Sequence, residues 1–533
     1  MASEFFGRHG QVAVAALLVL AFVLIALPGL SSRPFDKHEA LVLQTATEMQ
    51  LRDDWLVPYF NQQPRLNKPP LSYWATLGLA RLRSGGSPAS ITILDARLPS
   101  LLASLGVVLV LVLLGTHLAD RTTGLLAGAI YIASPALGFF AQDARPDTLY
   151  AFLCFAAFSA LLTAAECAAP VRRALGLWGG WTLFGLAVLA KGPHIPLFLL
   201  IALLLALRTV PSPALAPPSC DQEGWRTTLR RIRPAAGLTL ALLISVPWWW
   251  ALQNRIDPAV LADSQLAGEL YQPAWHGLRQ VYRELLGPIL LLLPWSLIPL
   301  IQWRRSKTLL GRSPAARRIA ILGLVPIALL LLAPQHRWHY SQPMIPFLAL
   351  LISMVILGER NAFTSRASPR TRLALATSFG LMLALLWANS SFGILWDRVR
   401  YERDLNLEVL VEAPYQSLPI LVTHSIESAY EIAVAKSGRR VTQVAEPEGV
   451  SDRARASGAS CVLVILPSTD LDRLSTERPP LELRRWPDRG KSLSVVLLTT
   501  RGSAADDCSR PGSNPDSNGV DFRPQRQHLP AAG

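Results

Sequence analysis

Residues 97–116 read RLPSLLASLGVVLVLVLLGT, a run whose only charged side chain is the arginine at its start. The hydrocarbon core of a bilayer is ~30 Å thick, and a helix of about 20 apolar residues crosses it. Comparable runs lie near residues 11–30, 97–116, 123–141, 148–168, 174–190, 193–208, 235–252, 284–303, 318–334, 340–358 and 372–396. These eleven runs predict an α-helical polytopic membrane protein with about 11–13 transmembrane helices.

The composition of the 533 residues agrees with this class. Hydrophobic residues make up 51% of the chain and charged residues only 17%, against about 25% charged in soluble domains. This excludes a disordered chain and argues against a single soluble globule. The formal net charge is +14; in a membrane protein such an excess reflects basic cytoplasmic loops, so we predict no nucleic-acid partner.

The loops between the runs predict an orientation. With the N-terminus in the cytoplasm, the inner loops carry basic clusters such as Arg304, Arg305 and Lys307, whereas the outer loops carry acids such as Asp36 and Asp147. This asymmetry satisfies the positive-inside rule. We therefore expect a multi-pass protein of the cell inner (plasma) membrane with its outer loops on the extracytoplasmic side.

The pattern changes after about residue 400. Short β-branched runs at 418–423, 461–466 and 493–499, with helical spacing over 425–436, predict a small extracytoplasmic α/β domain over 401–500. Residues 1–400 would form the transmembrane domain with a long first outer loop, 31–96, and we expect 501–533 to be disordered. The five cysteines are far apart and include no CxxC pair, so no zinc ribbon is indicated; a disulfide between Cys461 and Cys508 stays open.

The first outer loop holds the strongest candidates for chemistry. Asp36 and Glu39 are three residues apart and share a face if a helix starts there, which suits a general base; the alternative is that Asp36 only caps the helix. Lys68 precedes two prolines, a position that suits a lipid phosphate or simply a lysine that extends from a helix end.

The same loop contains residues that we expect at the membrane surface. Leu41, Val42 and Thr45 form one face of an amphipathic helix, which we expect to lie in the plane of the interface. The aromatic residues expected in an interfacial belt are Trp55, Tyr59, Tyr73 and Trp74.

Later outer loops add further charges. Asp147 starts a transmembrane helix, where it either complements the helix dipole or faces the site to hold a sugar hydroxyl, a cation or Lys68. Lys191, followed by Gly192-Pro193-His194, places a cation between two short spans. We predict that these loops form one composite site at the outer leaflet.

The last outer turn contains His336, Arg337, His339 and Tyr340. This set is more typical of an anion-binding cluster than of a metal site, because no carboxylate lies nearby in the sequence to complete the two histidines. We predict no certain cofactor, and a divalent metal ion stays open.

Several of these stretches resemble the GT-C glycosyltransferases that use polyprenyl-phosphate sugars, of the aminoarabinose transferase and dolichyl-phosphate-mannose protein mannosyltransferase types (glycosyltransferase family 39/83-like). Residues 54–61, DWLVPYFN, and 68–74, KPPLSYW, are similar to the pattern DW.VP.FN…KP.L.YW of that family. Residues 145–149 resemble its acidic turn, Lys191-Gly192-Pro193 its KGP turn, and 339–346 its late Y..P..P segment. The resemblance extends over most of residues 11–400.

The resemblance implies a GT-C fold, with an outer soluble C-terminal domain. It also implies transfer of a sugar, with inversion, from a polyprenyl-phosphate donor to a lipid, protein or glycan acceptor, as in lipopolysaccharide or protein glycosylation. The residues that we expect in catalysis are Asp36, Glu39 and Asp147, and those that we expect at the donor phosphate are Lys68, Arg65, His336, Arg337, Tyr340 and Lys191.

The sequence departs from the family in two places. Lys37 follows Asp36 and the glutamate comes at Glu39, whereas many members have adjacent Asp and Glu, so either carboxylate could be the base. Asn67 stands where the aminoarabinose transferases have Glu. The sugar therefore stays open.

A polytopic transporter or flippase of a lipid-linked or small substrate is the rival class. It predicts ionisable residues in mid-bilayer and a repeat between two halves of the chain. The spans are almost free of internal charge, and we see no internal repeat. The sequence therefore favours an enzyme.

Overall fold

The computed structural model describes residues 2–32, 36–85, 90–210, 229–263, 278–332, 338–358, 369–392, 407–412, 415–423, 429–474, 480–486 and 493–500. The chain divides into two compact units. One contains Met1–Arg33 and Arg65–Leu395, and the other Pro34–Pro64 and Trp396–Gly533. One division falls between residues 395 and 396, and the second unit also contains a piece of the first loop.

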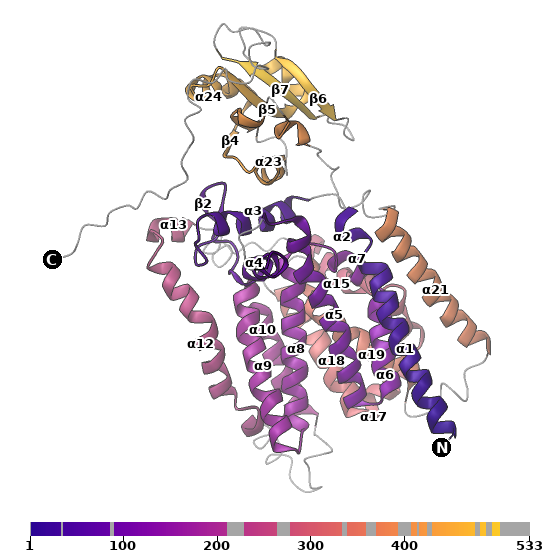
Figure 1. The fold of residues 1–533 in the computed structure, drawn as a ribbon. Helices are drawn as coiled ribbons and strands as arrows, with labels where there is room; N and C mark the ends of the chain where they lie inside the picture. The colour runs from indigo at the N-terminus through magenta and orange to yellow at the C-terminus, as the bar shows by residue number, and fades with distance from the viewer. Residues whose placement is uncertain are drawn as a thin grey trace, which may run out of the picture. The chain divides into compact units, whose positions relative to one another are not determined.

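Helices make up the first unit. Their bounds are α1 (Ala2–Ala26), α2 (Gly29–Ser32), α4 (Leu71–Arg83), α5 (Ile93–Leu118), α6 (Arg121–Ile132), α7 (Pro135–Phe140), α8 (Pro146–Glu166), α9 (Pro170–Lys191), α10 (His194–Thr209), α12 (Pro234–Gln253), α13 (Pro258–Asp263), α15 (Leu278–Leu291), η1 (Trp295–Leu297), α16 (Ile298–Ile301), α17 (Trp303–Arg312), α18 (Pro314–Leu332), η2 (Trp338–Met344), α19 (Ile345–Leu357) and α21 (Pro369–Phe392). The long helices lie side by side: α8 packs along α5 and α9, α10 along α18, and α6 along α19 (Figure 1).

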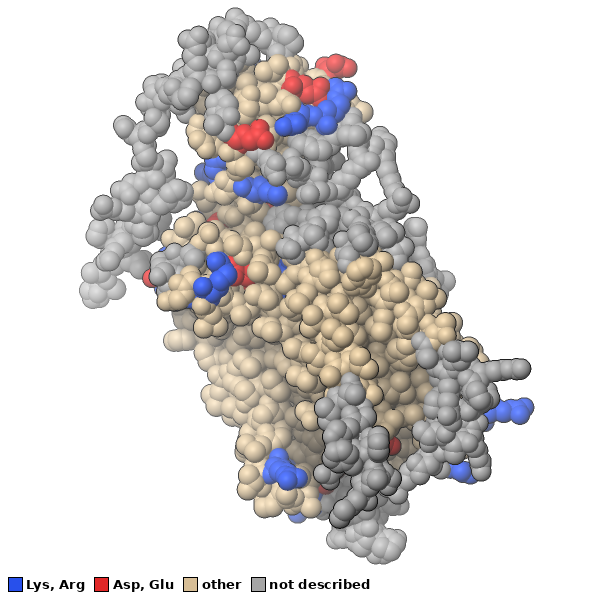
Figure 2. Space-filling model, turned by 45° about the vertical axis from the view of Figure 1, so that its right-hand side comes forward, with Lys and Arg blue, Asp and Glu red and all other residues tan. Residues whose placement is uncertain are grey.

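Within the described ranges, six helices are long and apolar enough to cross a membrane. They are Ile93–Leu118, Pro146–Glu166, Pro170–Lys191, Leu229–Gln253, Pro314–Leu332 and His339–Leu357, and two shorter apolar helices are Val14–Ala26 and His194–Thr209. In Figure 2 the described surface of this unit is mostly free of Lys, Arg, Asp and Glu side chains. The predicted class, a polytopic helical membrane protein, is confirmed.

Three predicted spans are wrong as continuous helices. The run at 123–141 is divided between α6 and α7, the run at 284–303 between α15, η1, α16 and the start of α17, and the run at 11–30 between α1 and α2. Proline explains the first break and contributes to the second, because it has no N–H and clashes with the preceding helical turn. Pro135 starts α7, and Pro294 directly precedes η1.

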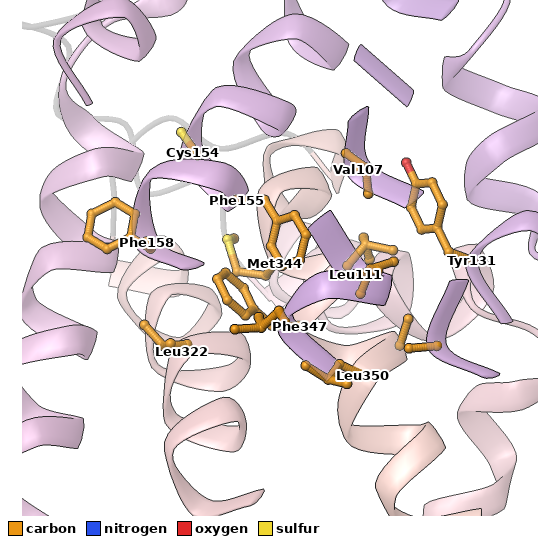
Figure 3. Packing of buried hydrophobic residues seen from close by; sticks show 14 of the residues in the cluster. Val107, Leu111, Tyr131, Cys154, Phe155, Phe158, Leu322, Met344, Phe347 and Leu350 are labelled. Atoms are coloured by element: carbon orange, nitrogen blue, oxygen red, sulfur yellow. The ribbon is translucent and has the colours of Figure 1, made fainter. Parts of the chain in front are cut away.

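The core of the helical unit consists of aliphatic and aromatic side chains from most of its helices (Figure 3). Phe155 of α8 meets Phe347 of α19 edge to face, with ring centroids 4.8 Å apart. Where α5 and α6 cross, a Cβ on Gly124 would collide with the backbone oxygen of Val112, so this close approach requires glycine.

A five-stranded sheet of order β4-β3-β5-β7-β6 forms the centre of the second unit. The strands are β3 (Ile420–Thr423), β4 (Val441–Val444), β5 (Cys461–Pro467), β6 (Leu481–Trp486) and β7 (Leu493–Thr499). β3 is parallel to β4 and β5, and β7 is antiparallel to β5 and β6. A small C-terminal α/β domain was predicted, and it is confirmed.

Helical segments pack against this sheet. They are η3 (Leu407–Leu410), η4 (Tyr415–Ser417), α23 (Ala429–Ser437), η5 (Pro447–Gly449), α24 (Val450–Ala456) and η6 (Ser468–Arg473). Two apolar clusters form the core of the domain. One contains side chains of α23 and η3, and the other contains side chains of α24. The expected helix over 425–436 is α23; Ser425, and the tail 501–533, lie outside the described residues.

The second unit also contains three elements of the first loop: α3 (Lys37–Leu51), β1 (Tyr59–Phe60) and β2 (Gln63–Pro64). α3 packs against α23, and Ala40 and Leu41 contact the apolar core beneath it. For Leu41 the prediction of a helix face lying in the membrane interface is therefore wrong, because the α/β domain covers it.

Tyr73 is a second correction. We expected it in the interfacial aromatic belt, but its side chain is buried in α4 of the helical unit, at 1% exposure. Its hydroxyl accepts a hydrogen bond from Nη1 of Arg65, and such a partner is what a buried tyrosine needs.

Candidate functional site

Three loops meet at one end of the helical unit. Asp147 lies in the first turn of α8, Lys191 is the last residue of α9, and His339 is in η2. Lys191 Nζ forms a hydrogen-bonded ion pair with Asp147 Oδ1, and His339 Nε2 is 3.7 Å from the same oxygen. The side chains of Lys191 and Asp147 are only 5% and 13% exposed. The loops therefore converge, as the composite site requires.

Local sequence fixes the ends of these helices. Pro146 occupies the first position of α8, where its missing N–H costs nothing, and Asp147 beside it is favoured by the positive end of the helix dipole. Gly192 ends α9 with φ of 123°, a conformation that side chains with a Cβ rarely adopt. The turn after Lys191 therefore needs glycine.

Aromatic rings surround the Lys191 ammonium. Its Nζ is 3.9 Å from the ring centroid of Tyr340 and 5.8 Å from that of Tyr150. Such cation–π contacts stabilise a cation that has little access to water. The Tyr150 hydroxyl donates to Gly192 O at 3.1 Å and accepts from Ile195 N at 3.3 Å, so it holds the turn that carries Lys191.

His194 closes the cluster on the side of Lys68. Its ring lies 5.7 Å from that of Tyr340, centroid to centroid, and the charges of Lys191 and Lys68 both act on it. Within the described part of the chain, its Nε2 is a buried atom without a hydrogen-bond partner. His194 is not among the residues predicted for the site; in the sequence, its place directly after the KGP turn is the signal for a role.

More charge comes from the segment before α8. Arg145 pairs with Asp143, Nε to Oδ2 at 3.1 Å, and its charge also acts on Asp147. The cluster thus combines cations from Lys68, Arg145 and Lys191 with carboxylates from Asp143 and Asp147. Such an array can bind an anion through its ammonium and guanidinium groups while the carboxylates hold those groups in place.

Asp36 and Glu39 lie in the other unit. The Asp36 side chain accepts hydrogen bonds from His38 N at 2.7 Å and Glu39 N at 2.9 Å, and Glu39 Oε2 accepts from Asp36 N at 3.3 Å. This is a capping box at the start of α3. The capping alternative for Asp36 is therefore confirmed as a structural role, and its catalytic role stays a prediction.

The remaining predicted site residues divide into two groups. Arg65 is half-buried on Tyr73, and Lys68 lies within electrostatic range of His194. His336 and Arg337 lie outside the described residues. In the described ranges no group of three or more His, Cys, Asp or Glu side chains is placed to hold a metal ion.

No protein-family model matches the chain. It is 25% identical over 415 residues to the undecaprenyl phosphate-alpha-4-amino-4-deoxy-L-arabinose arabinosyl transferase of Yersinia pestis (strain Pestoides F), covering 74% of this chain and 68% of that protein. The enzyme of the same name from Yersinia pseudotuberculosis (serotype O:1b, strain IP 31758) matches equally.

Solved structures show the same fold. ArnT from Cupriavidus metallidurans bound to undecaprenyl phosphate superposes with a TM-score of 0.67 at 16% identity, covering 93% of this chain and 99% of ArnT. The Archaeoglobus fulgidus oligosaccharyltransferase AglB, in complex with an inhibitory peptide and a dolichol-phosphate, gives 0.53 at 13% identity, covering 86% and 70%. The predicted GT-C fold is confirmed, and these relatives are transferases rather than transporters.

Proposed function

We propose that this chain, which has the GT-C fold, is a membrane glycosyltransferase that takes a sugar from a polyprenyl-phosphate carrier. The observation that carries the proposal is the convergence of Lys191, Asp147 and His339 with Tyr340 at one end of the helical unit. Two comparisons support it: relatives named for an undecaprenyl phosphate-linked donor, and the fold shared with a structure bound to undecaprenyl phosphate.

The chemistry follows from the charges. The bond between the sugar's anomeric carbon and the phosphate oxygen breaks, and its electron pair stays on the phosphate of the carrier. Ammonium groups on Lys191 and Lys68, with the Arg65 guanidinium, stabilise that developing charge. Asp147 holds Lys191 in the free enzyme, so the lysine is already oriented when the donor arrives.

The acceptor needs a base. In this proposal the carboxylate of Asp36 or Glu39 takes the proton from an acceptor hydroxyl, whose oxygen attacks the anomeric carbon from the face opposite the phosphate, so the configuration inverts. A positioned base of this kind contributes about 10²–10⁴-fold to the rate. The acceptor is a lipid, protein or glycan that reaches the outer face of the membrane.

We also propose that the protein lies in the inner (plasma) membrane with its α/β domain outside. Basic loops on the opposite side support this orientation. Cys461 of β5 is disulfide-bonded, and structural disulfides form in oxidising compartments such as the periplasm. Cys508, whose pairing with Cys461 the sequence leaves open, lies outside the described residues.

The test is a transfer assay on membranes with radiolabelled polyprenyl-phosphate sugars, including the 4-amino-4-deoxy-arabinose that the relatives' names give. We expect the wild type to transfer the labelled sugar from one of these donors to an acceptor, and we expect the Lys68→Ala substitution to abolish this transfer. Lys307→Ala is the matched control, because this lysine is exposed on α17, outside the cluster. Normal transfer by Lys68→Ala would show that the donor phosphate binds elsewhere, and no transfer by the wild type would refute the function.

A further inference from the structure

The carboxylate of Glu48 ties the hairpin of β1 and β2 to α3. Its two-residue turn, Asn61-Gln62, has φ of 52° and 66°, which is the left-handed backbone of a tight hairpin turn. Glu48 of α3 accepts from Asn61 N at 2.7 Å and from Gln62 N at 2.8 Å. Because both turn N–H groups end on Glu48, the hairpin and α3 form one piece.

The Asn61 side chain ties this piece to the α/β domain. Its Oδ1 accepts from Val441 N at 3.1 Å, and its Nδ2 donates to Val441 O at 2.8 Å. Val441 begins β4, an edge strand of the sheet. The amide thus pairs both backbone groups of Val441 as a neighbouring strand would, and such groups are costly to bury unpaired.

Tyr430 of α23 joins the polar and the apolar parts of this contact. Its hydroxyl accepts from Asn61 Nδ2 at 2.6 Å, and its ring meets Phe60 edge to face at 6.0 Å. Burial raises the pKa of Tyr430, which keeps the hydroxyl neutral at physiological pH. Ala40, one residue after Glu39, packs into the same core.

We propose that the C-terminal α/β domain positions α3, with Asn61 as the positioning residue, and so fixes the carboxylates of Asp36 and Glu39, one of which takes the proton from the acceptor hydroxyl. This rests on the proposed function. α3 has 15 residues, and an isolated helix of about that length is marginal in water. A base displaced by about 1 Å can cost about 10²-fold in rate. The domain supplies the rigidity that the helix alone lacks.

The test compares Asn61→Ala with wild type in the full-length protein, using transfer kinetics, undecaprenyl phosphate binding and hydrogen exchange. We expect faster amide exchange in α3 and a kcat lower by about 10- to 100-fold. The affinity for undecaprenyl phosphate should stay within about twofold, because Lys191 and Asp147 belong to the other compact unit.

Two further variants calibrate the result. Tyr430→Phe removes one hydrogen bond but keeps the contact with Phe60, so kcat should fall by only about two- to fivefold. Gln63→Ala alters an exposed side chain of the same hairpin and should leave kcat and exchange unchanged.

Three outcomes would overturn the positioning role: unchanged exchange in α3 of Asn61→Ala, faster exchange with unchanged kcat, or an equal loss of phosphate affinity. These outcomes leave the proposed function intact as long as the wild type transfers sugar. An inactive wild type would refute the proposed function, and the positioning role with it.

Discussion

Two regions of the molecule are stabilised in different ways. One is the cluster of Lys191, Asp147 and His339, and the other is the Asn61 contact in the α/β unit. In the cluster a carboxylate and aromatic ring faces surround a buried cation, so electrostatic attraction stabilises this region. At Asn61 neutral amide and backbone groups pair completely, so the contact fixes geometry without charge. In the proposed function the first region binds the donor, whereas the second orients the base.

The largest effect should come from the base itself. Asp36→Asn is expected to lower transfer by about 10²–10⁴-fold if Asp36 is the base, and Glu39→Gln would then lower it far less. Asn retains a side-chain oxygen that can cap α3, so the helix should survive. Initial rates on membranes with matched expression would decide between the two carboxylates, and equal, small losses would remove both from the chemistry.

Lys191→Met should come next. Without the ammonium, the buried Asp147 loses its hydrogen-bonded ion-pair partner, and removal of one partner from a buried ion pair costs about 3–5 kcal/mol. We expect loss of undecaprenyl phosphate binding together with a lower melting temperature. The double variant Lys191→Met with Asp147→Asn should recover the stability but not the binding. If the double variant binds the carrier phosphate normally, the cluster is only structural.

The opposite end of α8 offers a stability control. Glu166 pairs with Arg318 of α18, whose side chain is 2% exposed, and His117 Nε2 lies 4.0 Å from the same carboxylate. Arg318→Ala should destabilise the helical unit by about 3–5 kcal/mol, while the molecules that stay folded keep their affinity for undecaprenyl phosphate. Thermal unfolding in detergent, followed by binding to the folded fraction, measures both quantities.

The smallest effect is expected on the surface of the α/β domain. Arg473 pairs with Glu448 at 2.9 Å, but both side chains are about half exposed, and exposed pairs contribute little because water screens them. Arg473→Ala should leave both the melting temperature and the transfer rate unchanged. A clear loss of transfer would reveal a role for this face that the geometry does not suggest.

Sequence reasoning reached the donor cluster because span parity places Asp147, Lys191 and Tyr340 on one side, and the structure brings them together. It did not reach the Asn61 contact, since that contact joins residues 380 positions apart through a side chain that mimics a strand. Hydropathy also missed the break between α6 and α7, because the apolar run continues through Pro135. The periodicity of hydrophobic residues indicates which positions are buried. It does not indicate which distant backbone group a polar side chain will bind.

Residues of the first loop, from Ala40 to Phe60, share an apolar core with residues between Leu407 and Leu497, so the sequence boundary near residue 400 does not separate two independent parts of the fold. A chain shortened to end near residue 400 would leave Ala40, Leu41 and Phe60 without the apolar groups that cover them. Such a deletion would remove the α/β domain and would also destabilise the first loop, which lies hundreds of positions upstream. Transfer of the α/β domain to a relative would likewise require transfer of the first-loop segment that shares its core.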